Sequence, residues 1–188
     1  MFKKGAMFGL DARIALAIFG ALSVISGASL YSAIGNAKSV AILTDMREIA
    51  KAWEQYYLDT GRVVADQFSH TLDLDYLITD KSIRGWAGPY LSYSSSKSYG
   101  TAKLQYNDTA YISIVKGVSD DFKNVNSNQC SSGVNCFYWV ALNKIDGRHF
   151  DEIDNIVDGG DGIYSGNFRY HKNTSSEEFF YLKFAHVD

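Results

Sequence analysis

An acidic, glycine-rich stretch at residues 150–170, FDEIDNIVDGGDGIYSGNFRY, carries the residue types best suited to bind a metal ion. Its acidic residues include Asp151, Glu152, Asp154, Asp158 and Asp161, and Gly159, Gly160 and Gly162 lie among them. Carboxylates, backbone carbonyls and tight glycine turns are what Ca²⁺ binding requires, although the spacing is not that of an EF-hand loop. If this stretch binds calcium, Asp154, Asp158 and Asp161 are the best candidates for its ligands. The alternative is a solvated turn in which aspartates cap backbone N–H groups.

The two cysteines, Cys130 and Cys136, are separated by the short segment SSGVN. If this part of the chain is exported, an oxidising environment favours a disulfide between them. The alternative is a pair of metal ligands, but no further cysteine or histidine lies at a suitable spacing. We therefore predict a disulfide that closes a small loop and stabilises the fold only modestly.

A single carboxylate, Asp11, stands at the start of a long apolar segment, with Arg13 two residues away. A lone carboxylate at the centre of a bilayer costs about 2.5–3.5 kcal/mol on insertion scales, so its presence calls for a partner or a function. The simpler interpretation is that Asp11 begins a helix, where an acidic group is favoured.

Sequence motifs of enzymes are missing from the chain: it has no GxSxG elbow, HExxH, phosphate-binding loop or dinucleotide fingerprint. We predict a protein that is not an enzyme and needs no organic cofactor, with calcium as the one candidate ion. The formal net charge is −3, and no cluster of Lys and Arg suggests nucleic-acid binding.

The apolar segment itself runs from Ile14 to Ile34 without a charged residue. About 20 apolar residues suffice for a helix to cross a bilayer. Small residues at helical spacing, such as Ala17 with Ala21, allow helices to approach closely. A removable signal peptide is the alternative, since Ser26–Gly27–Ala28 offers a small-residue cleavage site.

The helical pattern continues beyond the apolar segment, which a signal peptide does not require. The residues Ile42, Met46, Ile49, Trp53 and Tyr56 recur in steps of four and three, as on one helix face. No proline interrupts the segment, and Gly61 is a plausible stop. We predict one helix from about residue 8 to about residue 59, roughly 75–80 Å long.

These N-terminal features resemble the type IV filament superfamily of pilins and pseudopilins. Members have a short basic leader, a cleavage point, a carboxylate as fifth mature residue and a glycine nine residues later. A cut between Ala6 and Met7 makes Asp11 the fifth mature residue and places Gly20 at the glycine position. The family usually has Gly before the cut, Phe after it and Glu as the carboxylate, and it has a proline further along the helix that is missing here. Gly5 and Gly9 are the alternative cut sites.

The resemblance implies that a prepilin peptidase trims the chain and that an assembly platform packs it with identical subunits into a helical filament. The carboxylate of Asp11 would then lie near the new, sometimes methylated, amine of Met7 in a neighbour. The subunit would reside in the bacterial inner membrane before assembly, and the filament in the periplasm or at the cell surface. A membrane-anchored periplasmic binding module that never polymerises is the alternative from another functional class.

A second likeness lies in the middle of the chain, where YYLDTGR begins at Tyr56 and GWAGPYL ends at Leu91. These elements are similar to the major pseudopilins of type II secretion, which bind calcium through a loop near the C-terminus. The family therefore leaves two uses open, a surface pilus and a periplasmic pseudopilus.

The remaining sequence predicts β-structure. Short β-type runs occur at residues 104–106, 110–115, 137–142, 168–171 and 179–184, and Asn107–Asp108 is a turn signal between the first two. A helical hint covers Asp73 to Ile78, and Ser92 to Ser98 is expected to be exposed. We predict an α+β fold of the pilin type, with four or five antiparallel strands packed on the outer half of the long helix. The expected organisation is a leader at 1–6, a transmembrane and assembly helix at 7–36, and a globular domain at 37–188.

Overall fold

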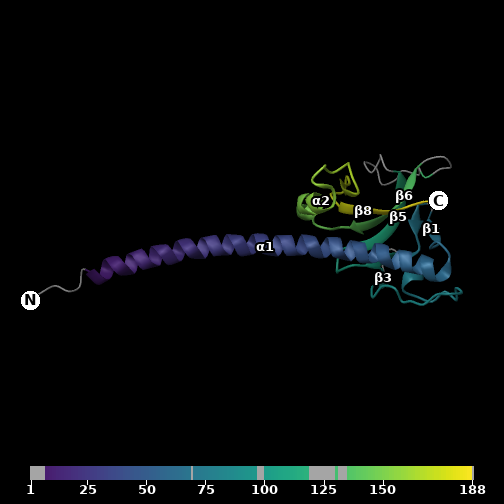
Figure 1. The fold of residues 1–188 in the computed structure, drawn as a ribbon, viewed down its shortest axis with the longest axis horizontal. Helices are drawn as coiled ribbons and strands as arrows, with labels where there is room; N and C mark the ends of the chain where they lie inside the picture. Colours follow the sequence, from purple (N-terminus) through teal and green to yellow (C-terminus); the bar gives the residue numbers. More distant parts are fainter. Residues whose placement is uncertain (1–6, 69, 97–99, 119–129, 131–134, 188) are drawn as a thin grey trace, which may run out of the picture. The chain divides into compact units, whose positions relative to one another are not determined.

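The computed structural model describes residues 7–68, 70–96, 100–118, 130 and 135–187 (Figure 1). The chain divides into two compact units, Met1–Lys38 and Ser39–Asp188. The helix α1, Met7–Thr60, contributes its first part to one unit and its last part to the other. The unbroken helix predicted from the periodicity is confirmed, within one residue at each end.

The end of α1 is fixed by a glycine. Gly61 adopts a φ of 65°, in the left-handed region that other residues disfavour, and its N–H donates to the carbonyl oxygen of Tyr57 at 2.8 Å. The hydroxyl of Thr60 donates to the carbonyl oxygen of Tyr56 at 2.7 Å. Two carbonyl oxygens of the last turn, those of Tyr56 and Tyr57, therefore accept hydrogen bonds from Thr60 and Gly61 at the helix end.

The globular unit contains an antiparallel sheet (Figure 1). Its strands are β1 Asp66–Phe68, β2 Thr71–Leu72, β3 Ser94–Ser96, β4 Gly100–Gln105, β5 Tyr111–Val118, β6 Cys136–Asn143, β7 Phe168–Lys172 and β8 Glu178–His186. The order is β1-β2-β5-β6-β8-β7, and β4 pairs with both β3 and β5. The short helices are η1 Leu74–Leu77, η2 Gly147–His149 and α2 Phe150–Asp158.

The five predicted strands are confirmed as β4 to β8, but the predicted number of strands is wrong. Among the described residues the sheet has eight strands, because the short β1, β2 and β3 extend it. Ser96 in β3 is buried, which corrects the expectation that the whole serine-rich segment is exposed. The turn at Asn107 is confirmed, since its side-chain oxygen accepts from the N–H groups of Thr109 and Ala110.

The main core lies between the last part of α1 and one face of the sheet. The predicted helix face is buried there, with Met46 and Ile49 fully enclosed. Ile112 and Ile114 of β5 point into this core, whereas Tyr111, Ser113 and Val115 alternate onto the opposite face. The sheet thus has one face against the helix and a second face with its own cluster of Val115, Trp139, Ala141, Phe179 and Tyr181.

Candidate functional site

The N-terminal half of α1 exposes its apolar side chains. Its most apolar 18-residue window has a mean hydropathy of 1.9, and none of that window is buried. Phe19, for example, is 71% exposed. By length and composition this helix is sufficient to cross a membrane. An apolar surface of this extent marks a region that lipid or protein covers.

The predicted processing and assembly residues lie at or near the start of this helix. Met7 is its first residue, and Ala6 lies outside the described residues. Asp11 and Arg13 are exposed. A Cβ atom added to Gly20 would meet no atom within 4 Å beyond the backbone of its own helix, so packing among the described residues does not require glycine at that position.

The helix α2 and the loop that follows it form the acidic site. α2 ends at Asp158, and the left-handed φ of 74° at Gly159 lets the chain reverse immediately after it. One carboxylate oxygen from each of Asp154, Asp158 and Asp161 lies within 4.8 Å of the others. The structure therefore brings together the three residues predicted as calcium ligands. Asp151 and Glu152 lie in the first turn of α2 and outside this group.

Asp158 organises the loop that returns to β7. Its Oδ2 accepts hydrogen bonds from the backbone N–H groups of Asn167 at 2.7 Å and Phe168 at 2.6 Å. Its Oδ1 accepts a hydrogen bond from the side-chain amide of Asn167 at 3.0 Å. This is the capping role that the alternative interpretation assigned to the aspartates. Asp158 therefore caps backbone N–H groups within the same cluster that brings the three carboxylates together.

Asp154 differs from its neighbours in its surroundings. It is 3% exposed, and its Oδ2 accepts from the N–H of Gly162 at 3.0 Å. Its Oδ1 is buried without a hydrogen-bond partner in the described part of the chain. Burial raises the pKa of Asp154, and the charges of Asp161, Asp158 and Asp151 raise it further. Such a group gains from a cation, because a buried acceptor left unpaired is costly.

Gly166 completes the site and was missed from the sequence. A Cβ atom at this position would lie 2.5 Å from Cγ of Asp158 and 2.8 Å from Oδ2 of Asp161. Its carbonyl oxygen also accepts from the guanidinium of Arg169, which packs 5.0 Å from the centroid of the Trp139 ring. Only glycine lets the loop approach the carboxylates this closely.

The predicted cysteine pair lies in bonding geometry. The sulfur atoms of Cys130 and Cys136 are at disulfide distance, with 5.5 Å between their Cα atoms. Cys136 is the first residue of β6, so the bond connects Cys130 to the start of this strand.

The segments that resemble pseudopilins pack against the end of α1. Tyr56 lies edge-on to the Tyr90 ring at 5.9 Å, and the indole N–H of Trp86 donates to the carbonyl oxygen of Tyr76 at 2.9 Å. A Cβ atom at Gly85, whose φ is 90°, would lie 2.2 Å from the carbonyl oxygen of Asp59. These residues close one end of the globular unit by packing.

Asp75 of η1 is a buried charge that sequence reasoning missed. Burial alone would raise the pKa of its carboxyl group, but hydrogen bonds from Lys81, Ser95 and Thr79 outweigh burial and hold the pKa below its usual value of 3.8. These bonds connect η1 to β3 and to the loop between them.

Searches for known proteins add no further constraint on this chain: no family model, no curated protein and no solved structure matches it.

Proposed function

We propose that the chain is the structural subunit of a type IV pilus-like filament, cut by a prepilin peptidase between Ala6 and Met7. The observation that carries the proposal is one unbroken helix, Met7–Thr60, with two different surfaces. Its first part is apolar and exposed, and its last part is buried in the core of a globular unit.

An exposed apolar helix needs a partner in each state of the subunit. Before assembly the bilayer would cover it, since its length and hydropathy suit a membrane span. After assembly the same surface would pack against the helices of other subunits, where small residues permit close approach. Gly20 and Ala17 would serve this packing, because neither contributes to the core of the single chain.

A removable signal peptide would have no reason to share a continuous helix with the core. Trp53 and Met46 hold the last turns of α1 on the sheet. A cut after Ala28 would leave a helix that begins at residue 29 and would discard the apolar surface. The continuity of α1 therefore favours retention of the apolar part in the mature protein.

Asp11 would act during assembly. Cleavage creates an amine on Met7, and a neighbour's Asp11 would pair with it among apolar helices, where charges are weakly screened. Since both charges lose water, the pair would set register more than it adds net stability. In the membrane before assembly, Asp11 would stand close to the polar headgroups.

Two alternatives make different predictions. A periplasmic pseudopilus uses the same subunit chemistry, and the likeness of the residues from Tyr56 to Leu91 to major pseudopilins favours it. An anchored binding module that never polymerises predicts an uncut chain and no effect of changing Asp11.

We further propose that calcium binds at Asp154, Asp158 and Asp161. The observation that favours it is the buried, unpartnered Oδ1 of Asp154 beside two other carboxylates. Carboxylate oxygens are the ligands that Ca²⁺ prefers. The ion would offset the mutual repulsion of the three charges and fix the loop that Gly166 closes. The role is structural.

Filament assembly in the native host tests the proposal. Asp11→Ala should reduce the filaments recovered by shearing at least tenfold, while the subunit remains in the membrane fraction. Glu54→Ala is the matched control, because Glu54 is an exposed carboxylate on the same helix outside the apolar segment. Normal filaments from Asp11→Ala would contradict the assembly role.

A further inference from the structure

The sequence pattern Asn-X-Ser/Thr occurs at Asn107–Asp108–Thr109 and again at Asn173–Thr174–Ser175. In exported proteins this pattern is the acceptor of N-linked sugars, which attach to the Nδ2 atom of the asparagine. Both tripeptides lie in the unit Ser39–Asp188, so export of that unit would present both of them to the same enzyme. The geometry around Nδ2 differs between the two sites, and this difference favours the first.

The first site lies in the turn that joins β4 to β5. The N–H groups of Tyr106 and Asn107 both donate to the carbonyl oxygen of Ala110, at 3.0 and 3.2 Å, so the acceptor tripeptide forms the tip of the hairpin. Asn107, Asp108 and Thr109 are all exposed, whereas Ala110 is buried. The whole tripeptide is therefore accessible from solvent.

The side chain of Asn107 is held through its oxygen. Its Oδ1 accepts hydrogen bonds from the backbone N–H groups of Thr109 at 3.0 Å and Ala110 at 2.8 Å, and from the hydroxyl of Thr109 at 3.2 Å. Its Nδ2 donates to no other residue in the described part of the chain. Because a glycosylated amide keeps its carbonyl oxygen, a sugar on Nδ2 would leave the bonds of the turn in place.

The donors around Oδ1 also suit the chemistry of sugar transfer. The nitrogen of an amide is a weak nucleophile, because resonance shares its lone pair with the carbonyl group. Negative charge develops on the oxygen when the nitrogen loses a proton, and donors that already point at this oxygen stabilise the charge. The hydroxyl of Thr109 is one of these donors, so the third residue of the pattern takes part in the geometry of the acceptor.

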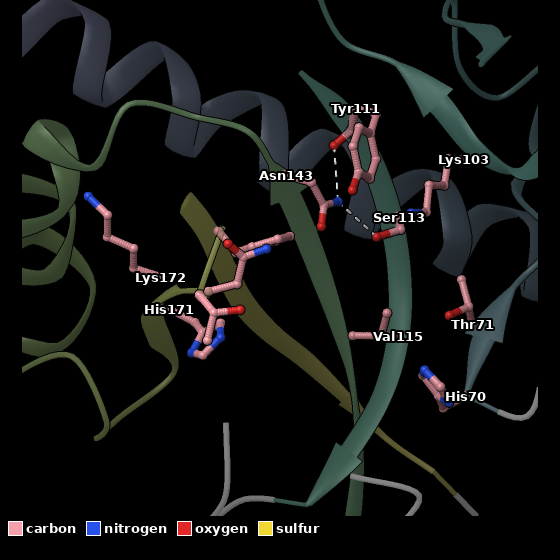
Figure 2. A pocket seen from close by; sticks show the side chains of 12 residues that line it. His70, Thr71, Lys103, Tyr111, Ser113, Val115, Asn143, His171 and Lys172 are labelled. Carbon is pink, nitrogen blue, oxygen red and sulfur yellow. Dashed lines mark hydrogen bonds between the residues drawn. The ribbon is translucent and has the colours of Figure 1, made fainter. Parts of the chain in front are cut away.

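The second site is held differently. Nδ2 of Asn173 donates to Oε2 of Glu177 at 3.1 Å, and its Oδ1 accepts from the N–H of Glu177 at 2.8 Å. Asn173 is half-buried, and with Thr174 it lines a pocket of about 450 Å³ on the sheet face opposite α1, beside His171 and Lys172 (Figure 2). A sugar on this Nδ2 would crowd both the bond to Glu177 and the wall of the pocket.

We propose that Asn107 is a site of N-glycosylation and that Asn173 is not. A glycosyltransferase of the host would use a donor in which the anomeric carbon of a sugar is esterified to a diphosphate. Nδ2 of Asn107 would attack that carbon, so that an N–C bond forms and the C–O bond to the diphosphate breaks. The diphosphate leaves with the bonding electrons, and the Nδ2 proton passes to a base of the enzyme. The sugar would place a bulky, solvated group at the tip of the hairpin.

Peptide mass spectrometry of protein from the native host's membranes or sheared filaments tests the proposal. Trypsin, which cuts after Lys and Arg, places the two sites in separate peptides, residues 104–116 and 173–183. Peptide 104–116 should carry sugar, in a fraction of copies at least about tenfold above that of peptide 173–183, because the second amide must lose a hydrogen bond before it reacts. Fragmentation by electron transfer should assign the sugar to Asn107.

The masses also distinguish two sources of such a donor. A single oligosaccharide mass indicates transfer of a preassembled sugar from a lipid diphosphate. A ladder of single-sugar additions indicates stepwise transfer from nucleotide sugars. Either pattern on Asn107 supports the proposal.

Variants separate the nitrogen atom from the turn. Asn107→Asp keeps an Oδ1 acceptor for the turn but lacks Nδ2, so peptide 104–116 should lose its sugar. Thr109→Val removes the hydroxyl at nearly constant size and should lower the modified fraction about tenfold or more, whereas Thr109→Ser should retain it. Ser175→Ala is the matched control, because it removes the hydroxyl residue of the second pattern at an exposed position and should leave peptide 104–116 unchanged.

Four results would overturn the proposal. They are an unmodified peptide 104–116 from the native host, equal modification of the two peptides, a sugar that persists in Asn107→Asp, and an unaltered modified fraction in Thr109→Val. The comparison of the two peptides uses the unaltered protein, so it stands even if a variant fails to fold. The test does not depend on filament assembly, because the pilus, the pseudopilus and the anchored module all require export of the globular unit.

Discussion

Asp154 is buried, whereas Asp161 is exposed and Asp158 is held by backbone donors, and this contrast decides how the acidic cluster should respond to a cation. A carboxyl group whose pKa is raised on folding keeps its proton to a higher pH than in the unfolded chain. Ionised Asp154 therefore opposes folding at neutral pH when no cation is bound. A bound cation reverses the sign of this contribution.

The variant Asp154→Asn separates the two states of the cluster. Without calcium it should be as stable as the original chain or more stable, because the amide keeps the size and an acceptor for Gly162 but carries no buried charge. With calcium, the original chain should gain about 2–3 kcal/mol at a concentration one hundred times its dissociation constant, and the variant should gain much less. Thermal unfolding with EDTA and with calcium measures both.

The control for this experiment is Asp151→Asn, which removes an exposed charge from the same helix outside the cluster. It should retain the gain from calcium. If calcium stabilised Asp154→Asn as much as the original chain, that result would contradict the proposed site. Stabilisation of the original chain by magnesium equal to that by calcium would also contradict it, because magnesium prefers stricter octahedral geometry.

Residue types identified the three clustered aspartates, because carboxylates near glycines are recognisable in sequence. Gly166 could not be found in this way. Its importance depends on a Cβ position that would collide with two carboxylates, and that collision exists only in three dimensions. Asp75 was missed for the same reason, since its donors come from other positions in the fold.

At the scale of elements, the long helix was predictable and several short elements were not. The 3.6-residue pattern through Met46 and Trp53 persists for many turns, and Gly61 marks the end. By contrast, β1, β2 and β3 have only two or three residues each, too few to establish an alternating pattern. They exist because neighbouring strands offer pairing partners.

The helix α2 shows how tertiary packing stabilises a helix of low intrinsic propensity. Its local helix signals are the acidic residues Asp151 and Glu152 in the first turn and Gly159 after the last residue. Its sequence, FDEIDNIVD, is rich in residues of low helix propensity, and no side chain caps its first residue. Phe150 and Ile153 are nevertheless buried, and the Phe150 ring stacks on Phe168 at 5.5 Å. Burial of these side chains stabilises α2, and it places Asp154 on the inner side.

The link between η1 and β3 gives an element-scale prediction. Asp75→Asn should lower the free energy of unfolding at pH 7 by about 1–3 kcal/mol, because Lys81 loses a charged acceptor and a buried network is broken. The folded-state pKa of Asp75 lies below its usual value, so the stabilisation is present above about pH 4 and is lost as the pH falls through the folded-state pKa. Urea unfolding followed by tryptophan fluorescence, at pH 7 and at pH 3, measures it.

The difference between this variant and the original chain should therefore shrink on acidification. Asp80→Asn is the control, since Asp80 is exposed and its carboxylate accepts a hydrogen bond from the N–H of Ser82 within its own turn. A difference that stays constant from pH 7 to pH 3 would show that Asp75 acts through its shape rather than its charge.

At the scale of the whole molecule, α1 would serve two environments with one continuous helix. The first part has an exposed apolar surface, and the last part supplies one layer of the core. The sequence predicted this division from the uncharged run and the amphipathic pattern that follows it. The sequence did not predict the pocket on the sheet face opposite α1. Residues as distant in sequence as Lys103 and His171 line it together only after the strands pair.

The N-terminal residue of the mature protein tests the central proposal most directly. It is measured by intact mass and peptide mass spectrometry on protein from the native host's membranes or sheared filaments. We predict a chain that begins at Met7, so that Asp11 is its fifth residue, with or without one methyl group on the amine. A chain that begins at Met1, or one that begins after Ala28, would contradict it.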